Sequence, residues 1–187
     1  MNWNVPGTTL TAPRQEIDDF CHQLGSMFLG GGIAMSQVTH ITGLDAYLIQ
    51  NWVKRGYLSK PEQKRYTLNQ LCRIITISML RGPLSMDQIC TLLAHVNGVL
   101  DREDDDLISD ADLYFLFLHL AAKARDLDNS QQWTQAIDDT LIHYQEPVPG
   151  AKERVAQVLR IMLTAWVASR MTQEAGKMME AISPKEE

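Results

Sequence analysis

Residues 33–97 constrain the fold most, because short helical patterns are separated there by closely spaced turn residues. Gly43 lies between two such patterns, which predicts a tight turn joining two short helices. A basic, proline-containing segment follows at 57–66. Two further helices then begin at capping-box sequences, Thr67-Leu68-Asn69-Gln70 and Ser85-Met86-Asp87-Gln88. This order predicts a winged helix-turn-helix within a mainly α-helical chain.

Charge is distributed unevenly along the chain, which carries a formal net charge of −6. Residues 33–97 contain seven Lys or Arg and three acidic residues, a net charge of +4. Residues 98–187 contain nine against seventeen, a net charge of −8. A basic segment within an acidic chain indicates a local contact with a polyanion, and DNA is the simplest one.

Composition is typical of a globular intracellular protein. A chain of 187 residues with 45% hydrophobic and 21% charged residues can bury a conventional core. Its three cysteines lie far apart in apolar helical patterns, which indicates buried, reduced thiols and a cytoplasmic location. No apolar run has the length of a signal peptide or a membrane span, so we expect a soluble protein without membrane contact.

Breaks in the helical pattern divide the chain into three expected segments. Residues 1–32 are expected to form an N-terminal helical extension, and residues 33–98 the winged helix-turn-helix. Residues 99–187 are expected to form a helical dimerisation or sensing domain. Its last helix is predicted from about Ala151 to Ala181, a length that usually reaches beyond one core. We therefore expect a homodimer.

The second helix of the predicted pair has the two faces that a recognition helix needs. Leu44, Leu48 and Trp52 form a stripe at helical spacing that is expected to be buried. The opposite face carries side chains suited to base edges in the major groove, namely Tyr47, Gln50, Asn51 and Lys54. The DNA-binding residues expected along the phosphate backbone are Arg55, Lys64, Arg65 and Tyr66. The alternative is a helical hairpin with an ordinary solvated basic face.

These residues also carry a resemblance to known families. The order of helix-turn-helix, proline-containing wing and two helices resembles the DNA-binding module of MerR-type regulators. More closely, the chain resembles domain-of-unknown-function family 1836, a bacterial group with a MerR-like fold and no assigned biochemistry. The matching segments are Ile41-Thr42-Gly43-Leu44, Gln50-Asn51-Trp52-Val53-Lys54-Arg55-Gly56, Lys64-Arg65-Tyr66 and Ser85-Met86-Asp87-Gln88-Ile89. The resemblance implies the fold.

Two departures limit what this resemblance implies. MerR-type recognition helices usually carry arginines at the positions of Tyr47 and Gln50, and tyrosines at those of Asn51 and Trp52. The base preference of those regulators therefore does not transfer. Metal-sensing relatives use cysteines beyond the dimerisation helix, and no cysteine follows Cys90 here. Their effector chemistry does not transfer either.

The sequence carries few signals for other chemistry. Acidic residues from Asp101 to Asp112 have the spacing of a calcium loop, but Asp106 stands where the turn needs glycine. Zinc spacings, phosphate-binding loops and nucleophile elbows are missing from the sequence, so we expect no metal, no cofactor and no enzymatic activity. In the aromatic, Met-rich C-terminal half, core packing is the default. A pocket for a small apolar effector and a subunit interface are the alternatives.

The sequence thus predicts a transcriptional regulator that binds double-stranded DNA as a dimer. The alternative function is a protein-interaction module that retains the helix-turn-helix shape without binding DNA. DNA binding requires the basic residues of the second helix and the wing to share an exposed face. An interaction module should show an apolar patch there instead.

Overall fold

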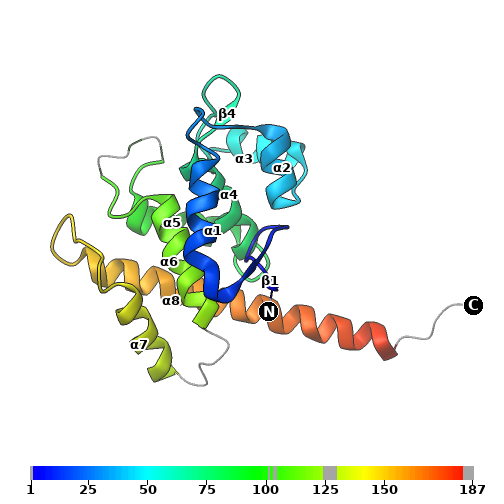
Figure 1. The fold of residues 1–187 in the computed structure, drawn as a ribbon, viewed down its shortest axis with the longest axis vertical. Coiled ribbons are helices and arrows are strands. Elements are labelled where there is room, and N and C mark those ends of the chain that lie inside the picture. The colour runs from blue at the N-terminus through cyan, green and yellow to red at the C-terminus, as the bar shows by residue number, and fades with distance from the viewer. Residues whose placement is uncertain (1, 101, 103–104, 124–129, 183–187) are drawn as a thin grey trace, which may run out of the picture.

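The computed structural model describes residues 2–100, 102, 105–123 and 130–182, and Figure 1 shows its architecture. Within these residues the chain is mainly α-helical, as predicted, with eight α-helices and two small two-stranded sheets. None of the helices in the described part is both long and apolar enough to cross a membrane.

The chain begins with a β-hairpin that the sequence analysis did not predict. The first elements are β1 (Asn2–Asn4), β2 (Thr11–Pro13), a 3-10 helix (Arg14–Glu16) and α1 (Ile17–Ser26), and β1 pairs antiparallel with β2. Trp3 packs edge-to-face on Trp166, with 6.3 Å between the ring centroids. The sequence analysis expected a helical extension here and missed the two strands, because strands of three residues show too little alternation to be recognised.

The middle of the chain follows the predicted order of elements. These are β3 (Ile33–Ala34), α2 (Met35–Thr42), α3 (Ala46–Lys54), β4 (Arg65–Tyr66), α4 (Leu68–Leu80) and α5 (Met86–Asn97). Both predicted capping boxes are confirmed. The Thr67 hydroxyl accepts a hydrogen bond from the Gln70 backbone at 3.2 Å, and the Ser85 hydroxyl accepts one from the Gln88 backbone at 3.3 Å. These caps fix where α4 and α5 begin.

The C-terminal half contains α6 (Asp110–Lys123), α7 (Ser130–Thr140) and α8 (Ala151–Ile182). The Ser109 hydroxyl accepts a hydrogen bond from the Asp112 backbone at 3.0 Å, as expected of a helix cap. The first part of α8 packs on α5, α6 and α7. Figure 1 shows its C-terminal part projecting from the body of the molecule.

One continuous core connects the three predicted segments. Helix α4 lies at its centre and packs on α2, α5, α6 and α8. Leu71, Cys72 and Ile77 point in different directions around this helix, and each is at most 1% exposed. The core also includes Ile17 from the first segment and Leu159 from the last. The predicted segments therefore share a core and are not packed as separate units.

Candidate nucleic-acid interface

A tight turn at Gly43 sets the geometry between α2 and α3. Gly43 has φ of 68°, and its backbone nitrogen donates to the Thr39 carbonyl at 2.8 Å. This left-handed conformation carries almost no steric cost for glycine, so the chain can leave α2 sharply. A Cβ atom at this position would lie 2.9 Å from Thr9 Cγ2. Close packing against the N-terminal hairpin thus adds a second reason for glycine.

Helix α3 presents one face to the core and the other to solvent. Ile49 and Trp52 are buried, with 0% and 4% of their surface exposed. The predicted base-contacting residues lie on the other side: Tyr47 is 80% exposed, Gln50 and Lys54 are exposed, and Asn51 is half-buried. Arg55, which follows the helix, is exposed as well. The solvent face therefore brings together the five residues predicted on this helix.

The wing is a small β structure with a strained tip. Strand β3 pairs antiparallel with β4, and a further bridge joins Glu62 to Arg65. The turn between these two residues contains Gln63 and Lys64, with φ of 45° and 62°. Two consecutive left-handed residues closing such a bridge are typical of a type I′ hairpin turn. This turn exposes the Lys64 side chain at the tip.

Figure 1 shows α2, α3 and β4 at one end of the molecule, with α8 at the other. The exposed cations of this end are Lys54, Arg55, Lys60, Lys64 and Arg65, and its exposed acids are Asp45 and Glu62. Arg65 also donates from Nη1 to the Gly32 carbonyl at 3.0 Å. That guanidinium group therefore supports the base of the wing while its residue remains exposed.

Gln70 positions the base of the wing, a role that the sequence analysis missed. Its Nε2 donates to the Ser59 carbonyl, the Ser59 hydroxyl and the Lys60 carbonyl at 3.0–3.2 Å. Its Oε1 accepts from the Thr67 backbone at 2.9 Å. The capping box indicated the second contact, but nothing in the sequence indicated the first set, because those partners lie outside the local motif.

Two residues of the basic segment are buried. Tyr66 was expected to bind DNA, but only 3% of its surface is exposed and burial raises the pKa of its phenol. Tyr66 pairs across the β3–β4 sheet with Ile33, which is also buried, so the Tyr66 side chain points into the core. Arg73 is also buried and pairs with Asp110 at 3.2 Å. Neither side chain contributes to the basic surface.

The acidic connector gives no support for a metal site. Asp101, Glu103 and Asp104 lie outside the described residues. Asp105 turns back toward α5, where its Oδ2 accepts from the Val99 backbone at 3.2 Å. Across the described part of the chain, no three His, Cys, Asp or Glu side chains are grouped so as to hold a metal ion.

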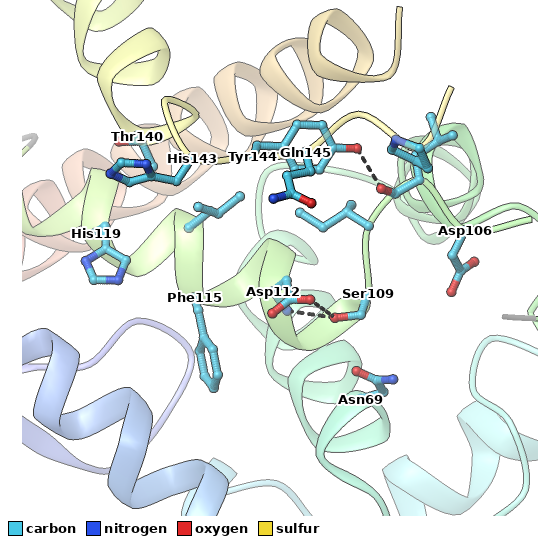
Figure 2. Close-up of a pocket in the computed structure, with 14 residues that line it drawn as sticks. Asn69, Asp106, Ser109, Asp112, Phe115, His119, Thr140, His143, Tyr144 and Gln145 are labelled. Atoms are coloured by element: carbon cyan, nitrogen blue, oxygen red, sulfur yellow. Dashed lines mark hydrogen bonds between the residues drawn. The ribbon is translucent and has the colours of Figure 1, made fainter. Parts of the chain in front are cut away.

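A groove of about 600 Å³ lies in the C-terminal half, between α6, α7 and the segment that precedes α6. Figure 2 shows His119 and His143 on one side of it, with Ser109 hydrogen-bonded to Asp112 on the other. The Tyr144 hydroxyl, also in the groove, donates to the Leu107 carbonyl at 2.6 Å. The lining mixes polar and apolar groups, so it does not single out an apolar ligand. The small apolar effector stays a prediction.

The part of the chain that carries this interface is similar to a known protein family. Residues 31–117 match the family model described as a domain of unknown function, DUF1836. The match covers the wing, α2 to α5 and the beginning of α6. Searches among curated proteins and among solved structures gave no match.

Proposed function

We propose that this chain is a transcriptional regulator that binds double-stranded DNA through a MerR-like winged helix-turn-helix. Helix α3 would enter the major groove, and the wing would lie along the phosphate backbone. Tyr47, Gln50, Asn51 and Lys54 would read base edges. Arg55, Lys64 and Arg65 would contact phosphates.

The observation that carries this proposal is the exposed polar face of α3 beside a cationic wing. Five exposed cations and two exposed acids give this end of the molecule a local excess of three positive charges. Within residues 33–97, Tyr47 is the single large hydrophobic side chain that is exposed. An interaction module would need an apolar patch at this end, so the surface favours a polyanion.

The conformation of the wing tip supports the same proposal. A non-glycine residue held in the left-handed region costs of order 1–3 kcal/mol, and such residues are enriched at functional sites. Gln63 and Lys64 both adopt this conformation, although Asn and Gly are the residues preferred in this turn.

The free end of α8 supports a dimer. Ala168, Met171, Ala175, Met178 and Ile182 follow the 3-4-3-4 spacing of a coiled-coil seam, and all five are exposed. Met171, Met178 and Ile182 are 62–75% exposed. We propose that a second copy of the chain covers this seam. Met171→Glu with Met178→Glu should convert the dimer to a monomer in sedimentation equilibrium.

The salt dependence of binding tests the wing. Each phosphate contact that a variant can no longer make reduces the slope of log K against log salt by about 0.9. Arg55→Gln with Lys64→Asn removes two of the cations proposed to contact phosphates, and asparagine tolerates the left-handed conformation at position 64. We expect the slope to fall by about 1.8 for each chain bound to the duplex, measured by fluorescence anisotropy.

Lys123→Gln with Lys152→Gln is the matched control, because these lysines lie on α6 and at the start of α8, away from α3, the wing and the proposed seam. It removes the same charge away from the proposed interface, so its slope should stay near that of the wild type. Equal slopes for the two double variants would refute the wing assignment. Absence of binding by the wild type at low salt would favour the interaction module.

A further inference from the structure

A second hollow, of about 740 Å³, lies between the β1–β2 loop, the C-terminal end of α4 and the middle of α8. Its lining includes Arg14, Arg81 and Arg170, and none of the described residues that line it is acidic. Arg81 and Arg170 are exposed, and no acidic side chain of the described lining offsets their charge. The charge therefore points to an anionic ligand.

The helix ends near this hollow do not cancel the charge of the arginines. Arg81 is the C-cap residue of α4, and Arg14 donates to the carbonyl of Ala122 at the end of α6 at 3.1 Å. Each helix C-terminus carries about half a negative charge. The end of α4 therefore offsets only about half of one of the two positive charges of Arg81 and Arg170.

Two of the arginines are held in a way that suits the recognition of oxyanions. Arg14 stacks over the Trp3 ring at 4.2 Å, and Arg170 stacks over Trp166 at 5.0 Å. Stacking leaves the N–H edge of the Arg170 guanidinium for a carboxylate or phosphate, whereas Arg14 donates to the Ala121 and Ala122 carbonyls. The indoles thereby fix the two cations in place with little loss of rotamer freedom on binding.

A buried donor in the same wall lacks a partner. Trp3 Nε1 is inaccessible to solvent and has no hydrogen-bond acceptor in the structure. A buried polar group without a partner costs about 1–3 kcal/mol, and most such groups in native proteins are satisfied. An acceptor oxygen of a ligand would remove this cost once a shift of the Trp3 side chain on binding exposes Nε1 to the hollow.

The loop that lines this hollow also holds the end of α2. The Thr9 backbone donates to the Ile41 carbonyl at 2.8 Å, and the Thr9 hydroxyl donates to the His40 carbonyl at 2.7 Å. Farther back in the loop, the buried Tyr114 hydroxyl donates to the Pro6 carbonyl at 2.8 Å. A ligand that orders this loop would therefore also stabilise the turn before α3.

We infer that this hollow is an effector site for a small organic anion that carries a phosphate or carboxylate group. Arg81 and Arg170 bind the oxyanion, and Trp3 Nε1 donates one further hydrogen bond. The volume lies within the range of small-molecule sites, so it accommodates more than a bare ion. Loop residues 5–9 transmit occupancy to α2. The effect of the anion on DNA affinity rests on the proposed function, whereas the binding itself does not.

Isothermal titration calorimetry of the full chain at constant ionic strength tests the site, with pyrophosphate and citrate as separate probes. We expect one of the probes to saturate a single site per chain, and its identity assigns the phosphate or the carboxylate class. Arg81→Gln with Arg170→Gln should weaken that binding at least about tenfold per arginine. Trp3→Phe, which keeps a ring but removes the donor, should weaken it about threefold.

The control variants remove the same groups elsewhere in the molecule. Lys152→Gln with Arg154→Gln deletes two cations at the start of α8, and Trp133→Phe deletes an indole N–H on α7; both should bind the probe like the wild type. No saturable binding of either probe, or equal binding by the Arg81/Arg170 double variant, would overturn the site.

Hydrogen exchange tests the connection to α2. The bound probe should slow amide exchange in peptides covering 5–9 and 39–43 of the wild type but not of the Arg81/Arg170 double variant. Unchanged exchange with the probe bound would overturn the effector role. Neither measurement contains DNA, so a chain that binds the anion but not DNA would refute the proposed function and leave the site intact.

Discussion

Helices α3 and α4 both carry cations from the basic segment, but they hold them in opposite surroundings. Lys54 and Arg55 at the end of α3 are exposed. Arg73 in α4 is 7% exposed, pairs with Asp110 and also donates from Nε to the Tyr57 carbonyl at 3.1 Å. The same residue type therefore supplies surface charge in one helix and internal structure in the other. Counting charges along a sequence does not separate these roles.

Among the substitutions that test this comparison, we expect the largest change in the free energy of unfolding at Arg73. Removing one partner of a buried ion pair leaves the other charge uncompensated and costs about 3–5 kcal/mol. Arg73→Ala should therefore lower the free energy of unfolding by that amount in urea denaturation. Arg55→Ala should change it by less than about 0.5 kcal/mol, as at most surface positions.

A double variant separates the loss of the Arg73–Asp110 ion pair from the loss of side-chain packing. Arg73→Met combined with Asp110→Leu replaces both charges with apolar groups, which is often neutral for a buried pair. We expect the double variant to be more stable than Arg73→Ala. A double variant as unstable as Arg73→Ala would mean that the destabilisation comes from packing and not from the stranded carboxylate.

Replacing one leucine by alanine in each helix compares how deeply α3 and α4 are buried. Leu71 in α4 is fully buried, whereas Leu48 in α3 is half-buried. Leu71→Ala should cost about 2–5 kcal/mol of unfolding free energy. Leu48→Ala should cost about 1–2 kcal/mol, because less apolar surface returns to water. Equal costs in urea denaturation would contradict this difference in burial.

The turn before α3 is expected to be sensitive to a single methyl group. Gly43→Ala should cost about 1–2 kcal/mol for its left-handed conformation, plus a contact with Thr9 Cγ2. Gly56 has φ of 73°, but a Cβ there would meet nothing within 4 Å, so Gly56→Ala measures the conformational cost alone. Adding Thr9→Ser to Gly43→Ala should recover the difference in melting temperature. No recovery would exclude the contact as its cause.

Thiol reactivity gives the smallest expected effect. Burial, followed by the nearby Asp18 charge, raises the pKa of Cys21 to about 12, and burial raises the pKa of Cys72 well above its ordinary value. Both thiols should remain protonated at about pH 8 and react slowly with iodoacetamide. Cys90, which is half-buried, should be alkylated first when peptides are followed by mass spectrometry. Faster labelling of Cys72 would mean that α4 opens in the native state.

Local signals were sufficient to predict much of the fold. The capping boxes fixed the starts of α4 and α5, and Gly43 fixed the turn before α3, because each motif is satisfied within a few residues. The rotation of α3 was predicted less well. The expected buried stripe contained Leu48, yet Ile49 is the fully buried residue and Leu48 is half-buried. A helix of nine residues has too few apolar positions to fix its rotation.

The remaining features depend on partners far away in the sequence. Arg73 is buried because Asp110 reaches it from the acidic half of the chain, a contact that neither local pattern contains. Tyr66 is buried because β4 pairs with β3, which precedes it by about thirty residues. The arginine hollow likewise combines a hairpin loop, α4 and α8. Such contacts appear only once the helices are packed.

The most direct test of the central claim is fluorescence anisotropy of the unmodified protein with two duplexes, at two salt concentrations. One duplex carries the region upstream of its own coding sequence, and the other carries a scrambled version. The account predicts tighter binding to the upstream duplex, with affinity for both falling as salt rises. Equal affinity for the two duplexes at every salt concentration, or no binding at low salt, would contradict it.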